Sequence, residues 1–226
     1  MAVGLQKDEE YKRSFQLGRY IGPVCRRCRG VGEKLFLKGE RCYTPKCAVD
    51  RRRVAPGDKS TKRFRRISDY GMQLREKQKA RFTYGLMESQ FVKYVKAAFT
   101  SDSSTGEYLI LQLETRLDNV ICRLGFADSH SQARQLVNHG HFLLNGRKTN
   151  IPSYQVKSGD IVRWKESRVN SEYVQALVRD LPKKPVPEWL QLDTKTLQGT
   201  VIRHPADDEL QSPFDTRLIV EFYSKR

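Results

Sequence analysis

Apolar residues in the middle of the chain recur at the spacing of a helix. The apolar positions of residues 113–124 come every three or four residues: Leu113, Leu117, Val120, Ile121 and Leu124. This period places them on one face of a helix-like stretch, and Arg116, Asp118 and Arg123 then lie on the opposite face. We therefore expect this stretch to bury one side and to keep a polar side.

A second helix and a hairpin are predicted directly after this stretch, over residues 128–164. Asp128 or Ser129 is a suitable N-cap, and Gly140 is a suitable stop because glycine adopts the left-handed backbone that ends many helices. Asn145-Gly146 stands between short apolar runs and favours the positive φ angles of a type I′ turn. These signals predict a compact module of two helices and a hairpin at 113–165.

Two longer helices are predicted before the module. Ser68-Asp69 is a good helix start, since it places an acid at the positive end of the helix dipole. After Tyr84-Gly85, a second helix would bury one stripe: Met87, Phe91, Val95, Ala98 and Phe99. Residues 101–107 (SDSSTGE) resemble a linker, which we take as the boundary between two domains.

The last sixty residues combine short apolar runs with proline-rich turns. Residues 181–189 (LPKKPVPEW) predict a rigid extended connection anchored by Trp189. Residues 200–205 and 217–223 are interpreted as β-rich or extended segments.

The charge of the chain is strongly one-sided. The 226 residues carry a net charge of +16, and nearly all of it lies in the first hundred residues. Residues 51–66 hold eight Lys or Arg and one Asp, and they cannot form a packed core by themselves. Clustered charge of this kind predicts a polyanionic partner, RNA in particular, with salt-dependent affinity. A solvated linker is the alternative for this segment.

Basic side chains from three segments are the candidates for contact with RNA phosphates. They are Arg51, Arg52, Arg53, Lys62, Arg63, Arg65 and Arg66 in the basic segment, Arg75, Lys77 and Lys79 in the following helix, and Arg116, Arg123, His130, Arg134, Arg147 and Lys148 in the module. Phe64 is a weaker candidate for stacking on a base.

Four cysteines form two close pairs. Cys25 and Cys28 are followed, after thirteen residues, by Cys42 and Cys47. Four thiolates at this spacing can surround one tetrahedral, structural Zn²⁺, which would help a short segment to fold. An iron–sulfur cluster, two disulfides or unliganded thiols are the alternatives. Cys122 is expected to be a small core residue.

Several function classes lack their usual signals. The chain has no phosphate-binding glycine loop, no nucleophile elbow, no zinc-protease motif and no dinucleotide fingerprint, so we expect no enzyme and no small-molecule substrate. No apolar run approaches the roughly 18 residues of a membrane span, and the N-terminal residues lack an apolar signal-peptide core. We expect a cytoplasmic protein.

Motifs along the chain resemble those of a known family. RLDNVICRLGF, QARQLVNHGH, LNGRK and NIPSYQVKSGD are similar to the signature of the fourth protein of the bacterial small ribosomal subunit. The resemblance extends to CRRCRG, KGERCYTPKC, SDYGMQLREKQK, VPEWLQLD and LIVEFYSKR, and so covers the chain from about Gly18 to its end. Some members of the family carry zinc.

The resemblance implies an α+β fold and a function. A mainly helical N-terminal domain with the four-Cys zinc module would precede an α+β domain built on the RNA-binding module. We expect residues 1–50 to form an N-terminal extension and the zinc module, 51–107 a basic loop and helical domain, 108–195 the α+β domain, and 196–226 a tail that packs back on the helical domain.

The function implied by the resemblance is that of a structural ribosomal protein. It would bind small-subunit (16S) rRNA at a multi-helix junction, nucleate assembly and influence translational accuracy. It would contact the fifth protein of the subunit, and its first domain would lie near the path by which mRNA enters. Two departures from the family reduce the charge of the module, because Thr115 and His130 stand where basic residues are usual. Phe82 replaces another basic residue.

Two other function classes remain open. The module also occurs, by resemblance, beside catalytic domains in pseudouridine synthases and some tRNA synthetases, but this chain has no remaining segment of that size. A free RNA-binding factor is the third possibility.

Overall fold

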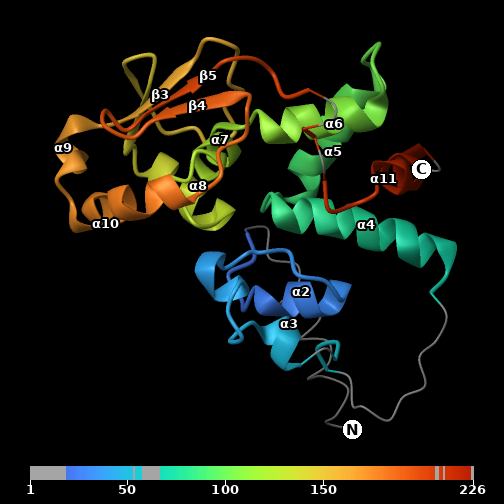
Figure 1. Cartoon of the computed structure of the whole chain (residues 1–226). Helices are drawn as coiled ribbons and strands as arrows, with labels where there is room; N and C mark the ends of the chain where they lie inside the picture. The colour runs from blue at the N-terminus through green and yellow to red at the C-terminus, as the bar shows by residue number, and fades with distance from the viewer. Residues whose placement is uncertain (1–18, 53, 58–66, 207–208, 211, 225–226) are drawn as a thin grey trace, which may run out of the picture.

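The computed structural model describes residues 19–52, 54–57, 67–206, 209–210 and 212–224. Five predicted RNA contacts, Arg53, Lys62, Arg63, Arg65 and Arg66, lie outside these residues, as do Phe64 and the N-terminal extension. Figure 1 shows three packed units: a sheet with its helices, a group of helices beside it, and a small blue N-terminal module below both. The α+β class is confirmed. None of the helices in the described ranges is long and apolar enough to cross a membrane.

The helical unit brings together segments from both ends of the chain. Its helices are α4 (Asp69–Thr83), α5 (Glu88–Phe99), α6 (Thr105–Glu114) and α11 (Thr216–Ser224). The Ser68 hydroxyl accepts a hydrogen bond from the Gly71 amide at 3.3 Å, which confirms the predicted helix start. The apolar core of the unit includes Phe91, Val95, Leu109, Leu113 and Ile219.

Three expectations for this unit were wrong. Residues 217–223 are not extended but lie in α11, because Ile219 and Phe222 are buried three positions apart on a helical face that packs against α4. The predicted linker ends earlier than expected, since α6 begins at Thr105 and packs in the helical core. Phe99, the last residue of α5, is exposed rather than buried.

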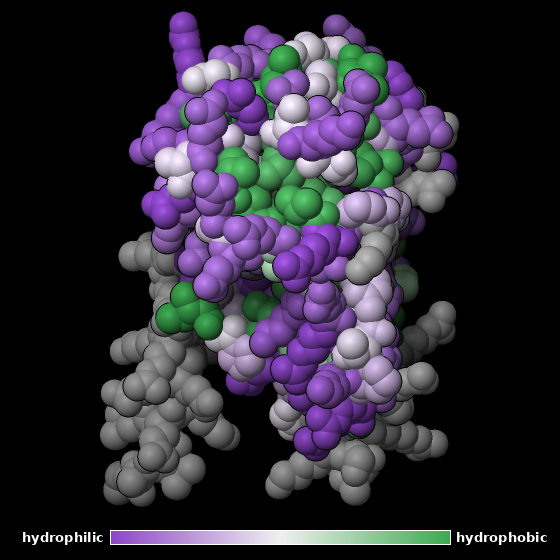
Figure 2. Space-filling model, turned by 60° about the vertical axis from the view of Figure 1, so that its left-hand side comes forward, coloured by the Kyte–Doolittle hydropathy of each residue, from purple (hydrophilic) through white to green (hydrophobic). Residues whose placement is uncertain are grey.

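The second unit is an antiparallel sheet covered by helices. Its strands, in the order β2-β1-β3-β5-β4, are β2 (Arg147–Thr149), β1 (Phe142–Leu144), β3 (Ile161–Trp164), β5 (Gln198–Val201) and β4 (Leu190–Asp193). Its helical segments are α7 (Leu117–Arg123), α8 (His130–Asn138), α9 (Glu166–Val169), α10 (Glu172–Asp180) and the 3-10 turn η2 (Leu181–Lys183). Figure 2 shows a largely hydrophilic surface on this side, with one apolar patch in its upper part.

Local signals in this unit are confirmed. Ser129 caps α8 by accepting from the Gln132 amide, and Gly140 follows the helix with φ +67°. Asn145 and Gly146 have φ angles of +49° and +78°, as a type I′ hairpin turn requires. Trp189 is buried in the core of the sheet unit, as expected of an anchor.

The predicted helix-like stretch at 113–124 is two helices rather than one. The backbone leaves the helix at Thr115 and Arg116, where it pairs with the loop after β2. The Val156 amide donates to the Thr115 carbonyl at 2.9 Å, and the Leu117 amide donates to the Tyr154 carbonyl at 2.8 Å. This break separates the two cores, because α6 packs in the helical unit and α7 packs under the sheet.

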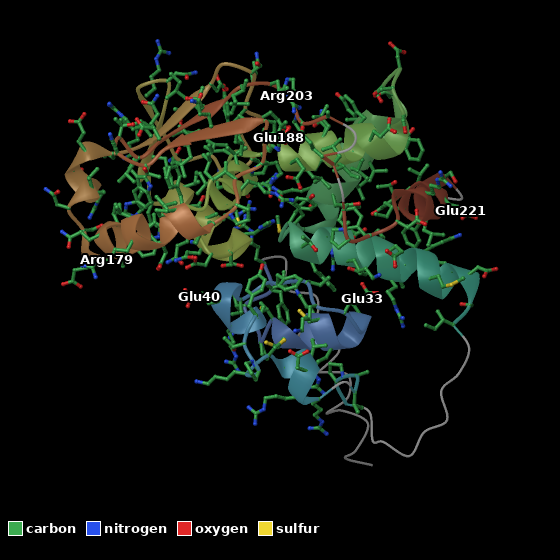
Figure 3. All side chains as sticks on the ribbon, viewed as in Figure 1. Glu33, Glu40, Arg179, Glu188, Arg203 and Glu221 are labelled. Carbon is green, nitrogen blue, oxygen red and sulfur yellow. The ribbon has the colours of Figure 1, made fainter. Side chains whose placement is uncertain are left out.

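The N-terminal module contains α2 (Cys25–Val31), the 3-10 turn η1 (Gly39–Cys42) and α3 (Ala48–Arg51). Its own apolar cluster is small and centres on Cys28, Val31 and Leu35. Glu33 lies on the side that faces α4 (Figure 3) and accepts from Lys79 Nζ at 2.7 Å. The Arg27 guanidinium sits between two rings, 4.3 Å from the Tyr20 centroid and 4.6 Å from that of Phe82. These contacts dock the module on the helical unit.

Candidate RNA-binding groove

A groove of about 2190 Å³ lies where the three units meet. Residues of the N-terminal module form one wall, α4 and the start of α5 form a second, and the region around the start of α8 forms the third. Eight basic side chains line it: Arg19, Arg26, Arg27, Lys34, Arg75, Arg81, Arg123 and Lys184. Three acidic side chains also line it: Glu40, Glu88 and Asp128. The excess of positive charge suits a polyanion.

Half of these cations are paired with carboxylates. Arg81 pairs with Glu88 at 2.9 Å, Lys184 with Asp128 at 2.6 Å, Lys34 with Asp50 at 2.7 Å and Arg123 with Glu114 at 2.7 Å. Arg26 and Arg75 have no carboxylate partner among the described residues. Their charges are available to a ligand.

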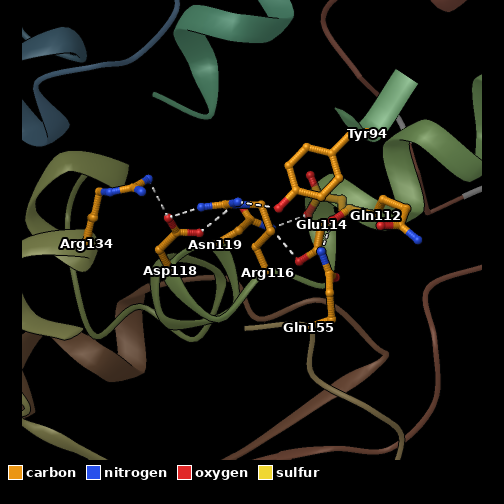
Figure 4. A network of polar contacts seen from close by, with 8 residues as sticks. All are labelled: Tyr94, Gln112, Glu114, Arg116, Asp118, Asn119, Arg134 and Gln155. Carbon is orange, nitrogen blue, oxygen red and sulfur yellow. Dashed lines mark hydrogen bonds and ion pairs between the residues drawn. The ribbon is translucent and has the colours of Figure 1, made fainter. Parts of the chain in front are cut away.

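A buried ion network joins α5, α7 and α8 (Figure 4). Arg116 donates to both carboxylate oxygens of Asp118, at 3.0 and 2.7 Å, and to the Tyr94 hydroxyl at 2.6 Å. Arg134 of α8 donates to the same carboxylate at 3.0 Å. The expected polar face is therefore wrong for Arg116 and Asp118, which are buried, because the Asp118 carboxylate compensates part of the charge of two buried guanidiniums and accepts their hydrogen bonds. Burial lowers the pKa of Arg134 to about 10, against the opposing effect of Asp118.

Glu114 is the centre of a second network. Its carboxylate accepts from the Tyr84 hydroxyl at 2.6 Å, from Asn119 Nδ2 at 2.7 Å and from Arg123 at 2.7 and 3.0 Å. Burial acts to raise the pKa of Glu114, but the charge of Arg123 and these hydrogen bonds bring it below its ordinary value. The carboxylate stays charged at neutral pH and joins α6 to α7.

Two predicted RNA contacts on α4 are turned inward. Lys77 Nζ lies 2.8 Å from both carboxylate oxygens of Glu88, and Lys79 Nζ lies 2.7 Å from a carboxylate oxygen of Glu33 and of Glu76. Both lysines are buried, so the expectation that α4 exposes them is wrong. The neighbouring Arg75 does line the groove.

The remaining candidates occupy three places. Arg51 and Arg52 are exposed at the end of α3, and Arg147 and Lys148 are exposed on the edge strand β2. Arg123 lines the groove from the end of α7. His130 begins α8 at the groove wall, where burial lowers its pKa and its Nε2 has no hydrogen-bond partner.

Sequence reasoning missed six cations of the groove: Arg19, Arg26, Arg27, Lys34, Arg81 and Lys184. Arg26 and Arg27 stand between the first two cysteines of the predicted zinc module. Lys184 stands in the proline-rich connection, far in sequence from every other basic cluster. No local pattern indicated that these segments meet.

The four paired cysteines gather in the N-terminal module. Cys28, Cys42 and Cys47 are buried, Cys25 is partly buried, and all are free thiols. The Lys38 amide lies 3.4 Å from Cys42 Sγ, and burial raises the pKa of the Cys28 and Cys42 thiols. Within the described ranges, no three His, Cys, Asp or Glu side chains form a group placed to hold a metal ion. Zinc remains a prediction.

Comparisons with known proteins agree with the architecture. Residues 19–114 match the family described as ribosomal protein S4/S9 N-terminal domain, and residues 115–162 match the S4 domain. The chain is 52% identical over 209 residues to small ribosomal subunit protein uS4 of Heliobacterium modesticaldum, covering 92% of this chain and all of the relative. Over the same shares, it is 50% identical to uS4 of Natranaerobius thermophilus and 49% to that of Geobacter sp. strain M21. The chain is therefore a member of the uS4 family of small ribosomal subunit proteins, and not an enzyme.

Proposed function

We propose that this chain is a structural constituent of the small ribosomal subunit and that it binds the rRNA of that subunit along the basic groove. The observation that carries the proposal is the excess of positive charge in a groove whose walls come from all three packed units. RNA phosphates are bound by Arg and Lys side chains, and a groove of fixed shape selects folded RNA by the spacing of its phosphates.

The proposed contacts are six basic side chains that have no carboxylate partner among the described residues. They are Arg26 and Arg75 in the groove, Arg51 and Arg52 at the end of α3, and Arg147 and Lys148 on the hairpin. Arg116, Arg134, Lys77 and Lys79 instead hold the groove walls in place through buried ion pairs.

Finer roles follow from the family and belong to the proposal. By holding a folded rRNA junction, the protein would nucleate assembly of the subunit and influence decoding accuracy. Its expected neighbours are the fifth small-subunit protein and, on the side of the N-terminal module, mRNA on its way into the subunit. The support for these roles is family membership.

A structural zinc ion is the proposed cofactor of the N-terminal module. Cys25, Cys28, Cys42 and Cys47 would hold it, since four soft sulfur donors are the usual set for structural zinc. The Cys28 and Cys42 thiols lie within electrostatic range of the other paired cysteines, and the Lys38 amide is directed at Cys42; both observations support this proposal. The small apolar cluster of the module supports it as well, because a metal ion would supply the stability that so few apolar contacts lack.

Binding of the full chain to a small-subunit rRNA transcript, measured at several salt concentrations, tests the proposal. Replacing Arg26 and Arg75 together by Ala should weaken binding and should reduce the slope of log K against log salt by roughly 1 to 2. Arg179→Ala is the matched control, since Arg179 is exposed on α10, away from the groove (Figure 3). Equal affinities for the folded transcript and a scrambled RNA would refute a structural role in the subunit.

A further inference from the structure

Two aromatic rings stack on the surface of the N-terminal module. The centroids of Phe36 and Tyr43 are 4.9 Å apart, with 28° between the ring planes. Phe36 is 45% exposed and Tyr43 is 76% exposed. Single apolar residues are common on surfaces, but a stacked and exposed pair presents a flat aromatic face to a ligand.

The backbone holds Phe36 in an unusual conformation. Its φ angle is +51°, in the left-handed region that bulky residues rarely adopt. The neighbouring Leu35 is buried in the small core of the module, so the reversed φ directs Phe36 outward beside Tyr43. The Tyr43 amide donates to the Glu40 carbonyl at 3.0 Å, which fixes the other ring. The backbone of Phe36 is strained, and its exposed ring buries too little apolar surface to offset that strain. The conformation therefore points to a function for the ring.

Basic residues flank the pair in the sequence. Lys38, Arg41 and Lys46 are exposed in the same loop, and Glu40 is its only acid. Both rings line the basic groove. The loop also touches the sheet unit, because a Cβ on Gly39 would lie 2.7 Å from Asp128 Cβ. The rings and the start of α8 therefore line the same groove.

We propose that Phe36 and Tyr43 form a stacking platform for an unpaired RNA base, with Lys38, Arg41 and Lys46 holding the flanking phosphates. Exposed bases of single-stranded or bulged RNA stack on aromatic side chains, whereas paired bases in a helix do not reach them. The inference rests on the proposed function and deepens it, since it names an unpaired nucleotide as the ligand of one place in the groove. Three exposed cations in the loop that carries the rings favour RNA over an apolar protein surface as the occupant.

Ultraviolet cross-linking of the unmodified full chain to a small-subunit rRNA transcript gives a direct test. A stacked base should cross-link to the ring that it touches, so mass spectrometry should find the nucleotide on Phe36 or Tyr43. Cross-links confined to other residues, in a complex that does form, would overturn the inference and leave the proposed function intact. Failure to form a complex would instead overturn the proposed function.

Substitution of Tyr43 gives a second test that separates stacking from charge. Tyr43→Ala should weaken binding to the transcript about tenfold with an unchanged salt slope, because stacking involves no counterion release. Tyr43→Phe should keep the wild-type affinity, since it keeps the ring. Phe99→Ala is the control, because that exposed ring lies on α5 outside the groove.

Four results would contradict the platform. Unchanged affinity of Tyr43→Ala would exclude a stacked base. An altered slope would assign the effect to displaced phosphates. Equal losses of affinity for Tyr43→Ala and Tyr43→Phe would indicate that the hydroxyl, rather than the ring, is recognised. If Tyr43→Ala weakened binding to the fifth ribosomal protein alone and left RNA affinity unchanged, the rings would be assigned to a protein contact.

Discussion

Arg116 and Asp118 stand two positions apart and form a two-point ion pair that is almost completely buried, with Nε–Oδ1 and Nη2–Oδ2 distances of 3.0 and 2.7 Å. The same carboxylate accepts from Arg134, and the same guanidinium donates to Tyr94. The pair therefore joins α5 of the helical unit to α7 and α8 of the sheet unit.

Asp118→Asn should destabilise the protein by about 3 kcal/mol. The substitution leaves two buried guanidiniums without a counter-charge, and breaking a buried pair in this way is costly. Urea unfolding of both proteins at pH 7 measures the difference. Asp102→Asn, at an exposed position, should change stability by less than about 0.5 kcal/mol. A small loss for Asp118→Asn would show that water enters the network.

The Glu114 network makes stability depend on acid pH. Because the pKa of Glu114 is below its ordinary value of 4.5, the folded protein binds fewer protons there than the unfolded chain does. The ionised Glu114 carboxylate therefore contributes its full stabilisation of the fold at pH values above 4.5, and this stabilisation is lost as the pH falls through the lower pKa of the folded state. Glu114→Gln should therefore cost about 2 kcal/mol at pH 7 and distinctly less at the lowest pH at which the protein still folds.

Urea midpoints at pH 7, 4.5 and 3.5 test this dependence. Glu107→Gln, at an exposed position of the same helix, should give a constant difference from wild type across the series. If Glu114→Gln and wild type also differed by a constant amount, the carboxylate would not be the acid-sensitive group.

Docking of the N-terminal module should depend on the ring of Phe82. Phe82→Leu keeps an apolar side chain but removes one of the two rings around Arg27, and such a contact contributes about 1 kcal/mol. Hydrogen exchange of the α2 amides should become about five times faster, while exchange in the sheet unit stays unchanged. Phe99→Leu provides the control. Equal acceleration in both units would mean global destabilisation rather than undocking.

Metal analysis decides the assignment of the four cysteines. The purified full chain should contain one zinc per molecule, and Cys47→Ser should lose it while Cys122→Ser keeps it. Removal of zinc by a chelator should raise hydrogen exchange in α2 and α3, because the module has little apolar core of its own. Iron in place of zinc, or retention of the metal by Cys47→Ser, would contradict the structural zinc site.

Helix caps and the hairpin turn could be predicted from the sequence. Ser68 and Ser129 cap helices as expected, and Asn145-Gly146 forms the expected hairpin turn, since each of these depends on a few neighbouring residues. The C-terminal segment was misjudged because its apolar run fits a strand and a helix equally well. Only contact with α4 decides in favour of a helix there.

The site was predictable in type but not in detail. Clustered charge indicated RNA, yet it did not distinguish Arg75, which faces the groove, from Lys77 and Lys79. Lys77 pairs with Glu88 of α5, and Lys79 pairs with Glu33 of the N-terminal module as well as with Glu76 of its own helix. The 46 positions between Glu33 and Lys79 are beyond the reach of any local pattern. The same holds for Asp118 and Arg134.

The groove has walls that belong to separately packed units, and the N-terminal module is held by few contacts. An RNA that contacts both the module and the sheet unit binds the docked arrangement more tightly than the undocked one. Binding of this RNA therefore raises the docking equilibrium constant, and docking raises the affinity for the RNA by the same factor. Loosening the Arg27 or Lys79 contacts would therefore weaken RNA binding without removing a single RNA contact. Bound RNA would in turn stabilise the docked position of the module.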